Sequence, residues 1–135
     1  MEELKLRKKL TTVVLLVLIT VSVSANVFAL TSTVNNSNYS LTGASNLSIG
    51  TSTWTASSST STTKNVDYIH LETAVYVDGI LLHEEEKSST ANTNLISYNS
   101  QTWNKASFTS FENMSYHSAN DTDYGNLSTV SDVTY

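Results

Sequence analysis

Apolar and polar residues alternate most clearly between Val66 and Lys87. The period of two is sustained from Tyr68 to Val77, a length typical of a β-strand with one buried face. Asp78-Gly79 follows, and this dipeptide favours a tight type I′ turn because both central residues of that turn need positive φ. The segment therefore predicts a β-hairpin whose second strand runs from Ile80 to Lys87.

A two-residue turn fixes which residues of the two strands face each other. The expected pairs are Val77 with Ile80, Val75 with Leu82, Ala74 with His83, Glu72 with Glu85 and His70 with Lys87. Cross-strand partners share a face. The face expected in the core carries Ile69, Leu71, Val75, Val77, Ile80 and Leu82. The face expected in solvent carries Tyr68, His70, Glu72, Tyr76, Leu81, His83, Glu85 and Lys87.

Weaker strand patterns occur elsewhere in the chain. They cover residues 46–56, 94–99, 106–111, 112–118 and 127–135. A turn is expected near residues 120–125, where Asn-Asp and Tyr-Gly occur. Six or seven short strands at such intervals predict an all-β fold, a small antiparallel β-sandwich or a small barrel, and we favour the sandwich.

The first thirty residues have a different pattern, which predicts export. Met1–Lys9 is basic, Leu10–Val23 is an uncharged apolar run, and small residues follow in Val23-Ser24-Ala25 and in Val27-Phe28-Ala29. This order is typical of a cleaved secretory signal helix. The alternative is an uncleaved membrane anchor from Leu10 to Leu30, roughly the 20 residues that a bilayer helix needs.

The predicted organisation has three parts. Residues 1–29 are a signal peptide or an N-terminal anchor, residues 30–63 are a Ser/Thr/Asn-rich segment with one strand, and residues 64–135 are the body of the β-sandwich. A secreted or cell-surface location follows from the first part.

Charge and composition limit the classes of partner that the chain is expected to bind. The net charge is −5, and the chain after residue 29 carries three lysines, no arginine and ten carboxylates, a formal charge of −7. Phosphate recognition depends on Lys and Arg, so we expect no nucleic-acid partner. Membrane contact is expected only through the N-terminal segment if it stays uncleaved. Cysteine is absent, so neither disulfides nor thiolate metal sites are expected.

One candidate metal site lies on the expected solvent face of the hairpin. His70, Glu72, His83 and Glu85 would point the same way from adjacent strands, and imidazole with carboxylate is a ligand set that Zn²⁺ accepts. The favoured alternative is an ordinary solvated face, on which Lys87 screens two exposed carboxylates. A one-residue slip of register would divide the four residues between opposite faces.

A second candidate combines His117 with Asp121 and Asp123. Two aspartates in a turn provide oxygen ligands for Ca²⁺, but the further acidic positions and the glycine of an EF-hand loop are missing. Aspartate is also common in turns because its side chain bonds the local backbone, which is the favoured alternative. No motif singles out a catalytic serine, so we predict neither catalytic residues nor a cofactor.

The chain also contains six Asn-x-Ser/Thr sequons. They occur at Asn35, Asn38, Asn46, Asn113, Asn120 and Asn126. Such a sequon marks an acceptor for N-glycosylation. Composition alone explains most of them, so whether they are glycosylated stays open.

The stretch from Val66 to His83, followed by Tyr116-His117, resembles a group of small secreted Ser/Thr-rich all-β proteins of uncharacterised function, mainly from Gram-positive bacteria. The resemblance covers residues 49–124. It implies a secreted β-sandwich and brings no catalytic residues with it.

The sequence therefore predicts a noncatalytic β-domain that acts by surface contact with a protein or with the cell envelope. Two other classes stay open, a small bacteriocin-like antimicrobial protein and a fibril or pilus subunit.

Overall fold

The computed structural model describes residues 26–135, which form nine strands and no helix. The strands are β1 (Asn26–Asn35), β2 (Ser40–Ile49), β3 (Thr53–Val66), β4 (Tyr68–Val77), β5 (Ile80–Ser89), β6 (Thr93–Asn99), β7 (Trp103–Asn104), β8 (Phe111–Asp121) and β9 (Gly125–Thr134). The all-β prediction is confirmed, and the nine strands exceed the six or seven predicted. Most of the predicted signal segment lies outside the described residues. Within them, no helix is long and apolar enough to cross a membrane.

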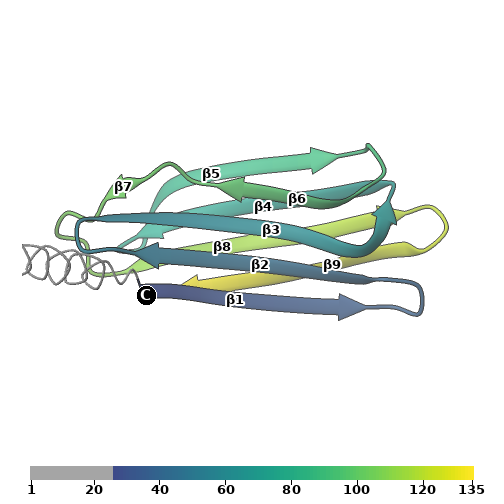
Figure 1. Ribbon diagram of the computed structural model, residues 1–135, viewed down its shortest axis with the longest axis horizontal. Helices are drawn as coiled ribbons and strands as arrows, with labels where there is room; N and C mark the ends of the chain where they lie inside the picture. The colour runs from purple at the N-terminus through teal and green to yellow at the C-terminus, as the bar shows by residue number, and fades with distance from the viewer. Residues whose placement is uncertain (1–25) are drawn as a thin grey trace, which may run out of the picture.

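The strands form two antiparallel sheets, stacked in a sandwich-like arrangement (Figure 1). Sheet A has the order β1-β2-β3-β6, with β7 paired to β3. Sheet B has the order β5-β4-β8-β9. Strands β1 and β6 are therefore the edges of sheet A, and β5 and β9 are the edges of sheet B.

The Ser/Thr/Asn-rich segment holds more structure than the single strand predicted for residues 30–63. It carries most of β1, all of β2 and the first part of β3. Every second residue of β2 is buried, from Leu41 to Ile49. This period of two was hidden in the sequence because Gly43 and Ser45 occupy inward positions that normally take apolar residues.

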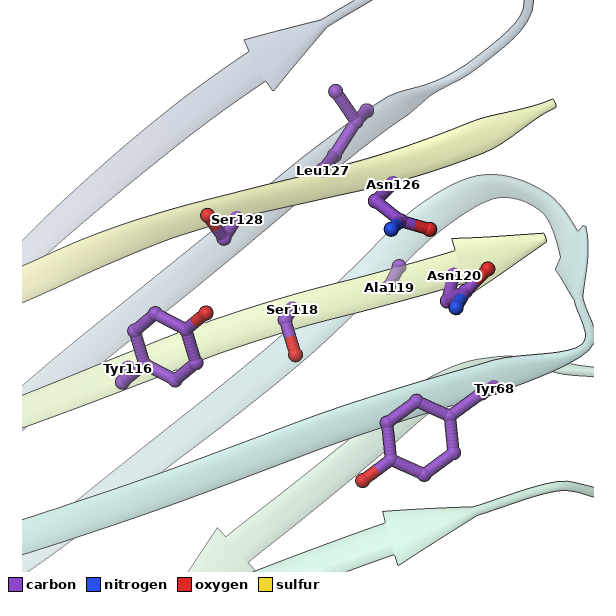
Figure 2. Close-up of a pocket in the computed structure, with 8 residues that line it drawn as sticks. All are labelled: Tyr68, Tyr116, Ser118, Ala119, Asn120, Asn126, Leu127 and Ser128. Carbon is purple, nitrogen blue, oxygen red and sulfur yellow. The ribbon is translucent and has the colours of Figure 1, made fainter.

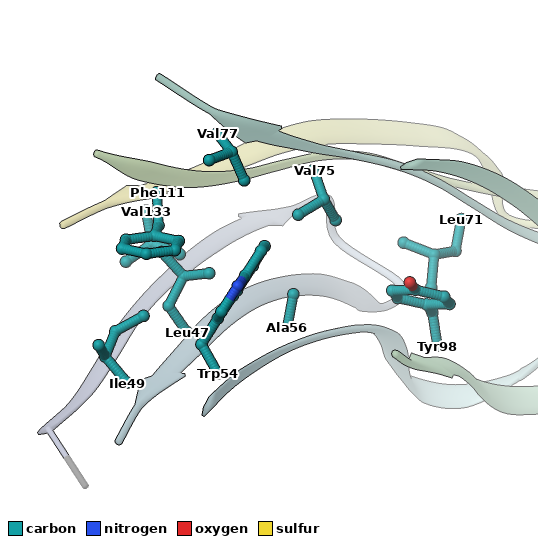
Figure 3. Packing of buried hydrophobic residues seen from close by; sticks show 10 residues of the cluster. All are labelled: Leu47, Ile49, Trp54, Ala56, Leu71, Val75, Val77, Tyr98, Phe111 and Val133. Carbon is teal, nitrogen blue, oxygen red and sulfur yellow. The ribbon is translucent and has the colours of Figure 1, made fainter. Parts of the chain in front are cut away.

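The interior contains two apolar clusters. The larger one joins side chains from both sheets (Figure 3): Leu47, Ile49, Trp54, Ala56, Leu71, Val75, Val77, Tyr98, Phe111 and Val133. The smaller one comprises Tyr39, Leu41, Val66, Ile69 and Ala119.

Buried polar side chains form a further layer of the interior. Its members share hydrogen bonds across the two sheets: Ser45, Ser58, Thr60, Thr73, Asn113, Ser115, His117 and Ser131. The Asn113 amide of β8 donates to the carbonyl oxygens of Asn46 and Ser57 in sheet A, at 3.1 and 3.0 Å. Because buried polar groups are stable only when paired, this layer fixes how the sheets are placed relative to each other.

The predicted hairpin exists, and its turn is correct. Asp78 and Gly79 have φ of 49° and 77°, and Val77 pairs with Ile80. The pairing then changes at a bulge, because Tyr76 pairs with Leu81 but Val75 pairs with His83. Leu82 is the extra residue of this bulge. The four other predicted pairs are therefore wrong by one residue.

The bulge changes which residues of β5 point inward. On β4 the predicted core residues Ile69, Leu71, Val75 and Val77 are buried. On β5 Ile80 is 73% exposed and Leu82 is 46% exposed, so both are wrongly predicted as core. Leu82 is the extra residue of the bulge, and beyond it His83, Glu85 and Lys87 take the half-buried side. Ile80 precedes the bulge and keeps its predicted partner, but it lies at the turn end of an edge strand, where it stays exposed.

Candidate functional site

The predicted zinc ligands do not come together. The bulge leaves His70 and Glu72 on the outer face of sheet B and turns His83 and Glu85 to the opposite side. His70 Nδ1 lies 3.7 Å from Glu86 Oε1, and His83 Nε2 lies 3.4 Å from Glu85 Oε2. Across residues 26–135, no three His, Asp or Glu side chains are close enough to hold one metal ion. The expectation that the four residues share a face is wrong.

The second predicted set is also divided. Asp121 Oδ1 accepts hydrogen bonds from the backbone N–H of Asp123 at 3.0 Å and of Tyr124 at 3.1 Å. This is the local turn bonding that the sequence left as the alternative to a calcium site. His117 points into the interior and is fully buried.

The surroundings of His117 determine its protonation. The Thr60 hydroxyl donates to the carbonyl oxygen of His70, so it accepts the hydrogen bond from Nδ1–H of His117 at 2.8 Å. Nε2 then accepts from the Ser131 hydroxyl at 2.7 Å. Burial lowers the pKa of His117 to about 4, so its ring is neutral at ordinary pH. His117 is a structural histidine.

The outer face of sheet B carries two hollows that share one lining residue. The larger, with a volume of about 290 Å³, is lined by Tyr68, Tyr116, Ser118, Ala119, Asn120, Asn126, Leu127 and Ser128 (Figure 2). The smaller, of about 150 Å³, is lined by Glu72, Ala74, Met114, Ser115, Tyr116 and Val130. Tyr116 belongs to both hollows, so we call them together the Tyr116 face.

The two tyrosine rings of this face are accessible to different degrees, since Tyr116 is exposed and Tyr68 is half-buried. Tyr116 is 43% exposed, and its ring centroid lies 6.2 Å from that of His70. His70 in turn stacks on Tyr68 at 6.1 Å, and its Nδ1 lies 3.2 Å from the Tyr68 hydroxyl. His70 therefore lies beside both tyrosine rings.

Sequence reasoning found only the β4 part of this face. Tyr68, His70, Glu72 and Tyr76 are on the solvent side as predicted. The β8 and β9 part, which includes Tyr116 and Asn126, was missed. Alternation in residues 112–120 predicts which β8 residues share a side, but the pairing of β8 with β4 joins segments about forty residues apart and leaves no local signal.

The outer face of sheet A is chemically different. Its outward β2 and β3 residues are small: Thr42, Ala44, Asn46, Ser48, Thr55, Ser57, Ser59 and Ser61. These positions place no aromatic ring on that face, so they make a suitable control surface.

A third hollow, of about 460 Å³, lies between β5 and the β6–β7 region and is lined by His83, Glu85, Lys87, Tyr98, Asn99, Gln101 and Trp103. Its groups are engaged with each other. His83 stacks on Tyr98 at 5.6 Å and Trp103 packs on Trp54 at 4.5 Å. Lys87 Nζ lies 4.0 Å from Glu85 Oε1. The rings and charges of this groove are thus less available than those of the Tyr116 face.

An apolar tip lies beside the β4–β5 turn. Val77, Ile80, Leu81, Leu82 and Phe108 line a hollow of about 250 Å³ there. The Asp78 carboxylate accepts hydrogen bonds from the backbone N–H groups of residues 109 and 110, and these bonds lower its pKa. They tie the loop that carries Phe108 to the turn.

Five of the six sequons are accessible to different degrees. Asn35, Asn38, Asn120 and Asn126 are exposed and Asn46 is half-buried, whereas Asn113 is fully buried.

No protein-family model matches the chain, and comparison with curated proteins and with solved structures finds no match either.

Proposed function

We propose that this protein is an exported, noncatalytic β-domain, built as a small antiparallel β-sandwich, that binds a component of the cell envelope through the Tyr116 face. The observation that carries the proposal is the pair of tyrosine rings, Tyr68 in one hollow and Tyr116 in both. Tyrosine provides a large amphipathic contact area with few rotatable bonds, which keeps the entropic cost of binding low. A protein of the cell surface is the other partner class that such a face fits.

The position of the rings on the sheet supports this proposal. Tyr68 and Tyr116 lie on β4 and β8, the two central strands of sheet B. Central strands are hydrogen-bonded on both sides, so their side chains are held more firmly than those of a loop. Binding sites on such elements are more precise than sites on loops.

Binding is tested with Tyr116→Ala. We expect this variant to bind an isolated cell-envelope fraction of the producing organism at least about tenfold more weakly than wild type, because it removes the ring common to both hollows. A sedimentation assay over a range of protein concentrations gives the affinities. Thr55→Ala on the outer face of sheet A is the matched control, with expected wild-type binding. Equal binding by both variants would contradict the proposed surface.

The proposed export includes removal of the signal peptide, and the pairing of β1 supports one of the two candidate cleavage positions. Strand β1 pairs with β2 over its whole length, beginning with Asn26 opposite Ile49. Phe28 packs on the larger apolar cluster, and its ring lies 4.8 Å from that of Tyr135. Cleavage after Ala29 would remove these contacts, whereas cleavage after Ala25 leaves β1 complete. We therefore propose cleavage between Ala25 and Asn26.

Mass spectrometry of the protein from culture medium tests the processing site. The expected mature chain begins at Asn26, and the signal residues before it are absent. A chain that begins at Leu30 would contradict the proposed site. Full-length protein found only in the membrane fraction would instead establish the uncleaved anchor and a cell-surface location.

The bacteriocin-like alternative is favoured by the apolar tip. Ile80, Leu81 and Leu82 are 73%, 47% and 46% exposed, and such a cluster is suited to contact with lipid. This function predicts dye release from bacterial-lipid vesicles and loss of that release in Leu81→Asp. Vesicles that stay intact at micromolar protein would exclude membrane disruption.

A further inference from the structure

We infer that the ligand of the Tyr116 face is an uncharged glycan chain, an inference that rests on the proposed binding function. The larger hollow combines ring faces with hydroxyl groups and side-chain amides, and no charged side chain lines it. Sugar rings present apolar C–H faces that pack on aromatic rings, and their hydroxyls both donate and accept hydrogen bonds. The amides of Asn120 and Asn126 provide one acceptor and two donors each, as such hydroxyls require.

The larger hollow differs from the groove beside β5 in the charge of its lining residues. In that groove the Glu85 carboxylate lies 3.4 Å from His83 Nε2 and 4.0 Å from Lys87 Nζ. A neutral ligand there would have to displace the contacts that Glu85 makes with His83 and Lys87. On the Tyr116 face the closest comparable pair, His70 with Glu86, lies outside both hollows. Glu72 is the one charged side chain that lines the smaller hollow, and the larger hollow has none, so an uncharged ligand loses least where it covers the larger hollow.

The extent of the face favours a chain over a single sugar. The two hollows follow β8 from Met114 to Asn120, roughly 20 Å at the rise of an extended strand. Tyr116 lies where the hollows meet. The ring is thus placed to stack on an inner sugar unit while the units on either side occupy the two hollows.

The backbone of this face argues against an extended peptide. Peptides commonly bind sheets by pairing with a free strand edge. Strand β4 is already paired with β5 and β8, and β8 is already paired with β4 and β9. A peptide laid across the face would find no free backbone groups, so recognition has to come from side chains. A sugar chain can be recognised by side chains alone, through ring stacking and hydrogen bonds to its hydroxyls.

The test uses the mature protein, made in a bacterial host without N-glycosylation because Asn120 and Asn126 are sequons on this face. Cello-, chito- and malto-oligosaccharides, each as the tetramer, are titrated by calorimetry. NMR follows the side-chain amides of Asn120 and Asn126. At least one sugar is expected to bind saturably, with shifts in these two amides.

Three variants locate the site. Tyr116→Ala and Asn120→Ala are each expected to weaken sugar binding about tenfold or more, and both positions are exposed, so folding is preserved. Gln101→Ala in the groove beside β5 is the matched control and is expected to bind as wild type. Sugar binding that depends on Gln101 and not on Tyr116 would overturn the inference.

The result also separates this inference from the proposed function. If no sugar binds while Tyr116-dependent binding to the envelope fraction persists, the glycan inference is wrong and the binding function stands. If neither sugars nor the envelope fraction bind, both are wrong.

Discussion

Replacing Gly43 by Ala is expected to lower the free energy of unfolding by about 3 kcal/mol. Gly43 lies in β2 with its Cα facing the ring of His117, and an added Cβ would lie 2.5 Å from Nε2 and still closer to two ring carbons. This is far inside van der Waals contact. The substitution would otherwise be mild, because Ala in place of Gly generally stabilises a position that it fits.

The ring of His117 has no room to move away. It is fully buried, and its two nitrogens are held by Thr60 and Ser131, one from each sheet. Rotation of the ring would break both hydrogen bonds and leave buried polar groups unpaired, at about 1–3 kcal/mol for each such group. The strain of Gly43→Ala therefore remains in the folded state.

Urea unfolding of three variants measures this effect. Gly43→Ala is expected to shift the midpoint strongly to lower urea, and His117→Ala to shift it as well. In the double variant the new methyl group occupies space that the ring has left. The double variant is therefore expected to lose less free energy of unfolding than the sum of the losses in the two single variants. Additive losses, or a Gly43→Ala midpoint equal to that of wild type, would contradict the proposed contact.

Acidification is expected to destabilise the protein through His117. The folded pKa is about 4 and the ordinary value is 6.5. Above pH 6.5 the imidazole is neutral in both states and the effect is absent. As the pH falls from 6.5 to 4, the unfolded chain takes up a proton that the folded protein excludes. The contribution of His117 to the free energy of unfolding therefore decreases over this window by about 2–3 kcal/mol and levels off below it.

A comparison of pH profiles isolates this contribution. The free energy of unfolding of wild type and of His117→Gln is measured between about pH 7.5 and 4, a range that covers the window in which His117 titrates. All other ionisable groups are the same in the two proteins, so the difference between the profiles reports on His117. The free energy of unfolding of wild type is expected to fall relative to that of His117→Gln as the pH falls. Parallel profiles would show that His117 titrates alike in the folded and unfolded states.

The hairpin shows how far sequence reasoning reaches. The turn at Asp78-Gly79 and the buried side of β4 were correct because both depend on local chemistry, the positive φ of two residues and a period of two. The register of β5 was wrong because the bulge at Leu82 depends on the surroundings of an edge strand. One extra residue moved His83 and Glu85 to the other side of the sheet, and the candidate zinc site was lost with them.

The candidate binding face shows the opposite failure. The sequence did not select Tyr116 and Asn120 as parts of a binding face, because a single tyrosine and a glycosylation sequon do not indicate which residues lie beside them. Their importance appears only when β8 pairs with β4, which brings Tyr116 opposite Glu72 and Ser118 opposite His70. Pairings between distant segments depend on the packing of the whole molecule, and local periodicity does not encode them.

Local chemistry alone determined that the chain makes strands, where its one tight hairpin turns, and that its N-terminal thirty residues have the pattern of an export signal. The tertiary structure decided the register of the edge strand, the burial of His117 beside Gly43 and the assembly of the Tyr116 face. The physical reason is range. Turn conformation and alternation act over a few neighbouring residues, whereas a bulge, a buried polar layer and a shared outer face form only when two sheets are placed against each other.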